Sequence, residues 1–171
     1  TLLYASVDVD EHSHVVEWPS NLPGDSAADG WIVVGAVIEH PTGLAEHAGS
    51  RPVVVVDGGI YDGTVDQINI DNLGGAYEAT RHLIACGHRE IGFIGGGTVA
   101  HPSILTRREG YLRALHDHDI PNSYLADSLV LGPHVAEEAA HKLLTNSPQI
   151  TAICASSDFV AIGVMKTAHA L

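Results

Sequence analysis

Gly95, Gly97 and Ala100 fit the G-x-G-x-x-A spacing of a dinucleotide site, in which the N-terminus of a helix faces a pyrophosphate. Such a site requires the helix to begin within the glycine segment. Because proline is tolerated only in the first turn of a helix, Pro102 predicts a helix that begins near residues 101 to 103, after the glycines. About twenty residues further on, where the pattern needs an acidic residue at the end of a strand, the chain has the loop sequence "HDHDIPNS". The spacing therefore argues against an NAD(P)-dependent enzyme, and we expect no bound cofactor.

Ser103 and Arg107 are four residues apart and share one face of the helix that begins there. Arg107 follows Ile104 and precedes Tyr111 on the apolar, inward stripe of that helix. A guanidinium on such a stripe can extend toward solvent or pair with a carboxylate. It can also project into a ligand cleft, where it donates hydrogen bonds to hydroxyls, ring nitrogens or carboxylates.

Histidines are frequent, and their densest groups are "EHSH" at 11 to 14 and "HDHD" at 116 to 119. Side chains two positions apart diverge on a helix, and the surrounding residues are polar. We therefore interpret both groups as solvated turns and expect no metal site.

The bulk composition limits the partners of the chain. Its 171 residues are 45% hydrophobic and include 8 basic and 21 acidic residues, a formal net charge of -13. A surface this acidic repels phosphate backbones, so the chain is not expected to hold nucleic acid itself. The two cysteines are far apart and fit reduced core residues of a cytoplasmic protein. No signal peptide and no apolar stretch long enough to span a bilayer is recognised, so we expect no membrane contact.

Strand and helix patterns alternate along the chain. Apolar, β-branched runs predict strands at 2–7, 31–38, 52–57, 91–95, 128–132 and 150–155. Helical patterns lie at 72–86 (behind Asp71 or Asn72 as N-cap, with Gly87 ending the helix), at 103–116, at 134–145, and from Ser157 or Asp158 onward. Residues 9–30 are predicted to be largely loop. Near-continuous apolar strands joined by helices predict an α/β fold with doubly wound parallel sheets.

Three linked segments resemble the effector-binding region of LacI/GalR transcriptional regulators. They are "DNLGGAYEATRHLIACGHREIGFIGG", the pattern S-x-x-x-R-x-x-G-Y-x-x-A-L from Ser103 to Leu115, and "ITAICASSDFVAIGVMKT". The resemblance begins near residue 29 and is strongest at 71–115 and 150–166. It implies a periplasmic-binding-protein-like domain of two doubly wound lobes, incomplete at both ends. Residues 1–88 would belong to the N-terminal lobe, with the helix at 72–86 in it, and residues 89–171 to the C-terminal lobe.

The resemblance also implies a function. A small effector, a sugar or related metabolite, would bind between the lobes and change their arrangement in a homodimer that is not an enzyme. Operator DNA would be bound only through an N-terminal head that the chain lacks. The same fold serves the sugar-binding proteins of ABC transporters, which is the alternative function.

Five residues match ligand-contacting positions of this family or its binding-protein relatives. Arg107 and Ser103 would contact the effector from the C-terminal lobe, and Asp57 from the N-terminal lobe. Ser157 and Asp158 stand where the family has an Asn-Asp pair. N-cap or turn roles for Asp57 and Asp158 remain an open alternative. An aromatic that the family often places after "SLVLG" is replaced by Pro133 and His134, which makes a simple hexose a less expected effector.

Overall fold

The computed structural model describes residues 6, 8–9, 15–17, 28–35, 37–38, 48–60, 65–95, 101–128 and 133–171. The chain divides into two compact units, Thr1–Ile70 and Asp71–Leu171.

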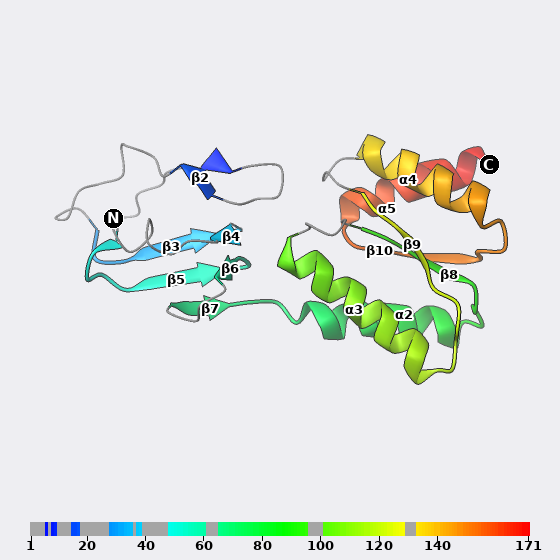
Figure 1. Ribbon diagram of the computed structural model, residues 1–171, viewed down its shortest axis with the longest axis horizontal. Helices are drawn as coiled ribbons and strands as arrows, with labels where there is room; N and C mark the ends of the chain where they lie inside the picture. Colours follow the sequence, from blue (N-terminus) through cyan, green and yellow to red (C-terminus); the bar gives the residue numbers. More distant parts are fainter. Residues whose placement is uncertain are drawn as a thin grey trace. The chain divides into compact units, whose positions relative to one another are not determined.

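The first unit is built from short strands (Figure 1). Strands β3 (Trp31–Val34), β5 (Val53–Val56) and β7 (Asp66–Ile68) form a parallel sheet in the order β3-β5-β7. Strands β4 (Val37–Ile38) and β6 (Gly59–Ile60) pair in parallel, and β1 (Asp8–Val9) and β2 (Val15–Glu17) pair antiparallel. The predicted strand at 31–38 is thus split in two, whereas the strand predicted at 52–57 forms β5 and β6 lies beyond it.

The core of this first sheet lies on one face. Val33 and Val55 are buried, whereas Ile32, Val34 and Ile68 are 70%, 69% and 61% exposed. Continuous apolar runs had predicted burial of both faces, and for β3 the structure instead shows alternation.

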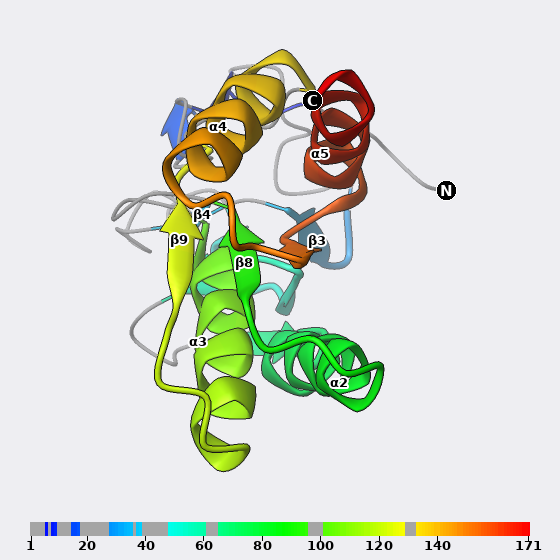
Figure 2. The same cartoon turned by 90° about the vertical axis from the view of Figure 1, so that its right-hand side faces the viewer.

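The second unit is a doubly wound layer structure. Strands β8 (Ile91–Ile94), β9 (Tyr124–Ala126) and β10 (Ala152–Ala155) form a parallel sheet in the order β10-β8-β9. Figure 2 shows helices α2 (Asn72–Ala85) and α3 (Pro102–Asp117) on one face of this sheet. Helices α4 (Pro133–Asn146) and α5 (Asp158–Ala170) cover the other face. The predicted parallel, doubly wound arrangement is confirmed for this unit.

Both faces of β8 are buried because helices cover the sheet from either side. One apolar cluster joins Ile91 and Phe93 to α2 and α3. The other joins Ile94 to α4 and α5. Side chains along a strand alternate between faces, so an uninterrupted apolar strand is what this sandwich requires.

Local capping sets the ends of the helices as the sequence predicts. The Asp71 carboxylate accepts a hydrogen bond from the Gly74 N–H at 2.8 Å and caps α2. At the other end, Gly87 adopts a φ of +95°, and its N–H donates to the Ile84 carbonyl. Pro102 is the first residue of α3, and the Ser157 hydroxyl caps α5.

Some predicted elements differ from the structure. The strand predicted at 128–132 is not found at Ser128, and residues 129–132 lie outside the described residues. Strand β9 lies earlier in the chain, at Tyr124–Ala126. The predicted strand at 2–7 also lies largely outside the described residues. Strand β2 lies within the predicted loop at 9–30, and the polar strand β7 had no apolar pattern to reveal it.

Helix α2 packs within the second unit, against α3 and the sheet, although the sequence had placed it in the first lobe. The boundary between the two compact units therefore lies between residues 70 and 71 of the sequence. The division of a complete effector domain into lobes at 1–88 and 89–171 stays a prediction.

Candidate functional site

The carboxyl ends of β8 and β10 are the point where the second unit changes winding direction. β8 leads into α3 on one face of the sheet, and the neighbouring β10 leads into α5 on the opposite face (Figure 2). In open α/β sheets, ligands bind outside the strands at such a switch point, because the two connections diverge there. The residues at these two strand ends are therefore the candidates for a ligand site.

Arg107 extends from α3 toward this switch point and is half-buried. Its Nε donates a hydrogen bond to Oδ1 of Asn72 at 2.8 Å. Its Nη1 donates to the backbone carbonyl of Ser156, directly after β10, at 2.6 Å. Arg107 thus joins the first turn of α2, the second turn of α3 and the end of β10.

Both partners of Arg107 are neutral. Among the described residues, no carboxylate pairs with its guanidinium, and no acceptor contacts Nη2. The carboxylate pairing that the sequence left open is therefore absent from the described part of the chain. A half-buried cation that is oriented by neutral acceptors keeps its electrostatic attraction for a polar or anionic ligand.

Ser156 and Gly95 lie against each other at the two strand ends. The Ser156 N–H donates to the Ile94 carbonyl at 2.9 Å, which continues the pairing of the strands. A Cβ on Gly95 would lie 2.2 Å from the Ser156 hydroxyl oxygen, so only glycine allows this approach. Gly95 is therefore required for packing against Ser156.

A close crossing of α2 and α3 brings Asn72 to Arg107. A Cβ on Gly110 would lie 2.3 Å from the Leu73 carbonyl oxygen, so the two helices touch backbone to backbone at this glycine. Gly110 follows Arg107 by three residues, and Leu73 follows Asn72 by one. The contact between the helices thus fixes the distance between the arginine and the asparagine.

Ser103 lies at the first turn of α3, where His101 is the N-cap. The Nδ1 of His101 accepts from the Ser103 N–H at 3.3 Å and lies 2.8 Å from the Ser103 hydroxyl. Because Nδ1 accepts these bonds, the ring in this arrangement carries its proton on Nε2. Ser103 and Arg107 share the helix face predicted for them, but no direct contact joins them.

Ser157 and Asp158 begin α5 directly after the Arg107 contact. The Ser157 hydroxyl accepts from the Val160 N–H at 3.4 Å, so it acts as the N-cap. Asp158 is exposed in the first turn, where a carboxylate complements the positive end of the helix dipole. Both residues thus have local structural roles at the switch point.

Asp57 lies in the first unit, at the carboxyl end of β5. It adopts a φ of +49°, and its N–H donates to the Ile68 carbonyl at 2.9 Å. A left-handed backbone is uncommon for a residue other than glycine and occurs at turns and functional sites. Its place relative to Arg107 stays a prediction, because the two residues belong to different compact units.

The sequence did not indicate the partners of Arg107. Asn72 appeared only as a possible N-cap, a role that Asp71 has instead. Ser156 gave no signal, because it is the backbone carbonyl that acts, and any residue provides one. An amide residue at the start of a helix that follows a strand could have been noted for Asn72.

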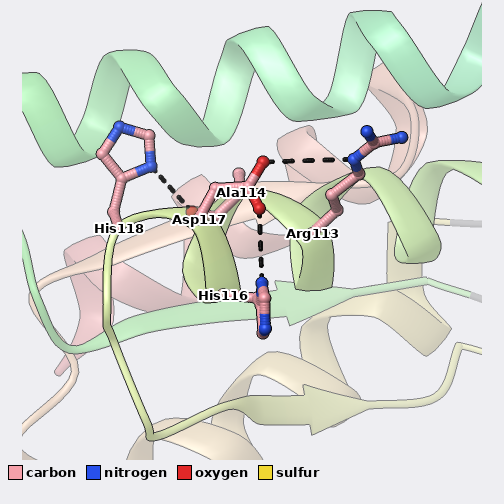
Figure 3. A network of polar contacts seen from close by, with 5 residues as sticks. All are labelled: Arg113, Ala114, His116, Asp117 and His118. Atoms are coloured by element: carbon pink, nitrogen blue, oxygen red, sulfur yellow. Dashed lines mark hydrogen bonds and ion pairs between the residues drawn. The ribbon is translucent and has the colours of Figure 1, made fainter.

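The other motifs do not assemble into sites in the described part of the chain. Gly97 and Ala100 of the glycine pattern lie outside it. Figure 3 shows that His116 and His118 point in different directions, His116 toward Asp117 and His118 toward the Ala114 carbonyl. The hydrogen bond from His116 lowers the pKa of Asp117. Within the described ranges, no three His, Cys, Asp or Glu residues lie close enough to hold a metal ion.

Among the helices of the described residues, none combines the length and hydropathy needed to cross a bilayer.

The comparisons with known proteins agree with one another. Residues 22–170 match the family described as "Periplasmic binding proteins and sugar binding domain of LacI family". The HTH-type transcriptional repressor PurR of Yersinia pestis (strain Pestoides F) is 34% identical over 150 residues, which are 84% of this chain and 42% of the repressor. The chain thus spans about two fifths of the length of the curated relatives that it matches.

Two solved structures show the same fold. A regulatory protein of LacI family from Chloroflexus aggregans is 25% identical with a TM-score of 0.72, covering 83% of this chain and 51% of that one. A sugar-binding transcriptional regulator of the LacI family from Escherichia coli, complexed with phosphate, is 26% identical with a TM-score of 0.65, covering 78% and 51%. These likenesses confirm the fold class that the sequence predicts.

Proposed function

The chain belongs to the family of periplasmic binding proteins and LacI-type sugar-binding domains, and from this premise we propose that it is the effector-binding part of a ligand-responsive transcriptional regulator. The relative and the two structures described above are transcriptional regulators. The observation that carries the proposal is the half-buried Arg107, held by two neutral acceptors at the switch point of the sheet.

The effector is a small polar molecule, a sugar or related metabolite. Arg107 donates to its oxygen or nitrogen atoms through Nη2, and Ser103 on the same helix face contributes a hydroxyl. Ser157 and Asp158 complete the site at the start of α5. The site binds and releases its ligand without catalysing a reaction.

Ligand binding controls transcription by population shift. The effector favours one arrangement of the two lobes of the complete domain, which changes the spacing of DNA-binding heads in a homodimer. The heads belong to the complete regulator, which acts in the cytoplasm. The acidic chain described here contributes the response to the ligand, and not the contact with DNA.

We assign the homodimer contact of the second unit to α5. Phe159, Ile162 and Met165 follow one another at intervals of three residues and are 58%, 42% and 55% exposed. Residues three apart share a helix face, so these side chains form an apolar stripe. Covering such a stripe removes apolar area from water and favours association.

Titration calorimetry tests the function with three probes that match the donors of Arg107. D-ribose presents hydroxyls, adenine presents ring nitrogens, and D-gluconate presents a carboxylate. We expect saturable binding of a probe and a loss of affinity of about tenfold or more in Arg107→Ala, since a hydrogen bond to a charged group is lost. Arg113→Ala, an exposed arginine on the same helix, is the matched control.

Equal affinity in Arg107→Ala and Arg113→Ala would remove Arg107 from the site. Absence of binding by all three probes would contradict the proposed ligand class.

A transport-associated sugar-binding protein is the second candidate, because the matching family includes periplasmic binding proteins. The coding sequence upstream of Thr1 decides between the two. A helix-turn-helix segment would identify a regulator, and a secretory signal would identify a transport protein in which Arg107 keeps its ligand role.

A further inference from the structure

We propose that Asn72 is a positioning residue of the effector site, whose side-chain carbonyl holds the guanidinium of Arg107 in its ligand-binding orientation. The inference rests on the proposed function of Arg107. It assigns a role to a residue at the start of α2, which lies 35 positions away from the arginine in the sequence.

Two contacts determine the orientation of the guanidinium. Because the group is planar, fixing the directions of Nε and Nη1 also fixes the direction of Nη2. Asn72 accepts from Nε at 2.8 Å, and the Ser156 carbonyl accepts from Nη1 at 2.6 Å. Without Asn72, the carbonyl of Ser156 alone would hold the end of a long side chain with several rotatable bonds, and Nη2 would sample many directions.

Asn72 is itself held firmly. Its side chain is buried, with 9% exposed. The preceding residue caps α2, and the following residue, Leu73, touches Gly110 of α3 with its carbonyl. The acceptor oxygen therefore has a fixed place relative to the helix that carries Arg107, which is what preorganisation of a binding group requires.

A packing role for Asn72 predicts a different response to mutation. If Asn72 only fills space, Asn72→Ala leaves a small cavity, and Asn72→Asp is worse because it buries a charge. If Asn72 positions Arg107, Asn72→Asp retains an acceptor for Nε and adds an opposite charge, whereas Asn72→Ala has no acceptor. The two roles thus predict opposite orders of the two variants.

The direct test is the hydrogen exchange of the Arg107 Nε–H, measured by NMR on the ligand-free chain. The resonance is assigned by its loss in Arg107→Lys. We expect the Nε–H to exchange at least about tenfold faster in Asn72→Ala, since its hydrogen bond is gone, and to stay protected in Asn72→Asp. Asn122→Ala, at an exposed loop position, is the control. Unchanged protection in Asn72→Ala, or equal loss in both variants, would overturn the proposal.

The same variants titrated with D-ribose, adenine and D-gluconate report on the ligand. We expect the dissociation constant of the probe that binds to rise about tenfold in Asn72→Ala and to recover in Asn72→Asp. Equal affinity in Asn72→Ala and the native chain would overturn the positioning role. If no probe binds while the exchange pattern holds, the positioning of Arg107 stands, and it is the proposed ligand class that fails.

Discussion

The hydroxyl of Tyr111 links two strands of the second sheet, and its removal should destabilise that unit strongly. Tyr111 lies on α3 with none of its surface exposed. Its Oη donates to the Ile91 carbonyl of β8 at 2.7 Å and accepts from the Tyr124 N–H of β9 at 3.2 Å. One side-chain group thus satisfies two backbone groups at the start of neighbouring strands.

Tyr111→Phe keeps the ring and removes this bridge. The Ile91 carbonyl lies in a fully buried residue and cannot regain a partner from water, while Tyr124 is half-buried. A buried polar group that loses its partner costs about 1–3 kcal/mol, so we expect a loss of about 2–4 kcal/mol in the free energy of unfolding. Tyr77→Phe removes a hydroxyl that bonds Asp117 at the surface, where water can replace it, and should lower the free energy of unfolding much less.

Urea unfolding followed by far-ultraviolet circular dichroism measures this difference, because α2 to α5 all lie in the second unit. Equal midpoints and slopes for Tyr111→Phe and Tyr77→Phe would refute the reasoning, since the bridge would then contribute nothing. Faster hydrogen exchange of the Tyr124 amide in Tyr111→Phe would locate the effect at β9.

Three further predictions follow from single contacts. Burial raises the pKa of Tyr111 from 10.0 to about 12, so the stability that this residue contributes is complete below pH 10 and is lost as the pH rises toward 12. Between pH 10 and pH 12, the free energy of unfolding of the native chain should therefore fall by about 2–3 kcal/mol more than that of Tyr111→Phe, as measured by alkaline unfolding. Gly110→Ala should lower the free energy of unfolding in urea by about 1–3 kcal/mol, because the new Cβ meets the Leu73 carbonyl. Gly75→Ala, with open space around it, should instead raise this free energy by up to about 1 kcal/mol through helix propensity. Equal effects of the two substitutions would contradict the close crossing of α2 and α3. Ile162→Glu should raise the dissociation constant of the dimer about tenfold or more in sedimentation equilibrium, whereas the control Leu112→Glu on α3 should leave it unchanged. An unchanged dissociation constant in Ile162→Glu would exclude α5 from the interface.

Local sequence signals predicted the second unit well. The helix ends follow from Asp71, Gly87, Pro102 and Ser157, which act on neighbouring backbone groups. The apolar run at 91–95 predicted a strand covered on both faces, and β8 is buried on both. The first unit was predicted less well, because β7 is a short polar strand and β3 is covered on one face only.

In the candidate site, too, only the local features could be predicted from the sequence. The spacing of Ser103 and Arg107 determined that they share a helix face, and the inward stripe determined that Arg107 points toward the interior. Its partners could not be predicted, because Asn72 and Ser156 are 35 and 49 residues away. Only the folded chain shows that Arg107 meets neutral acceptors and no carboxylate among the described residues.

The sequence by itself determined where the helices of the second unit begin and end, that the strands of the two three-stranded sheets are parallel, and which arginine faces inward. Caps, glycine conformations and hydrophobic periodicity act over only a few residues, so local sequence is enough to specify these features. The tertiary structure alone decided that α2 packs with the second unit and that Asn72 reaches Arg107. That outcome depends on the approach of two helix backbones at Gly110, a contact between segments far apart in the chain, and no local pattern encodes the angle at which two helices cross.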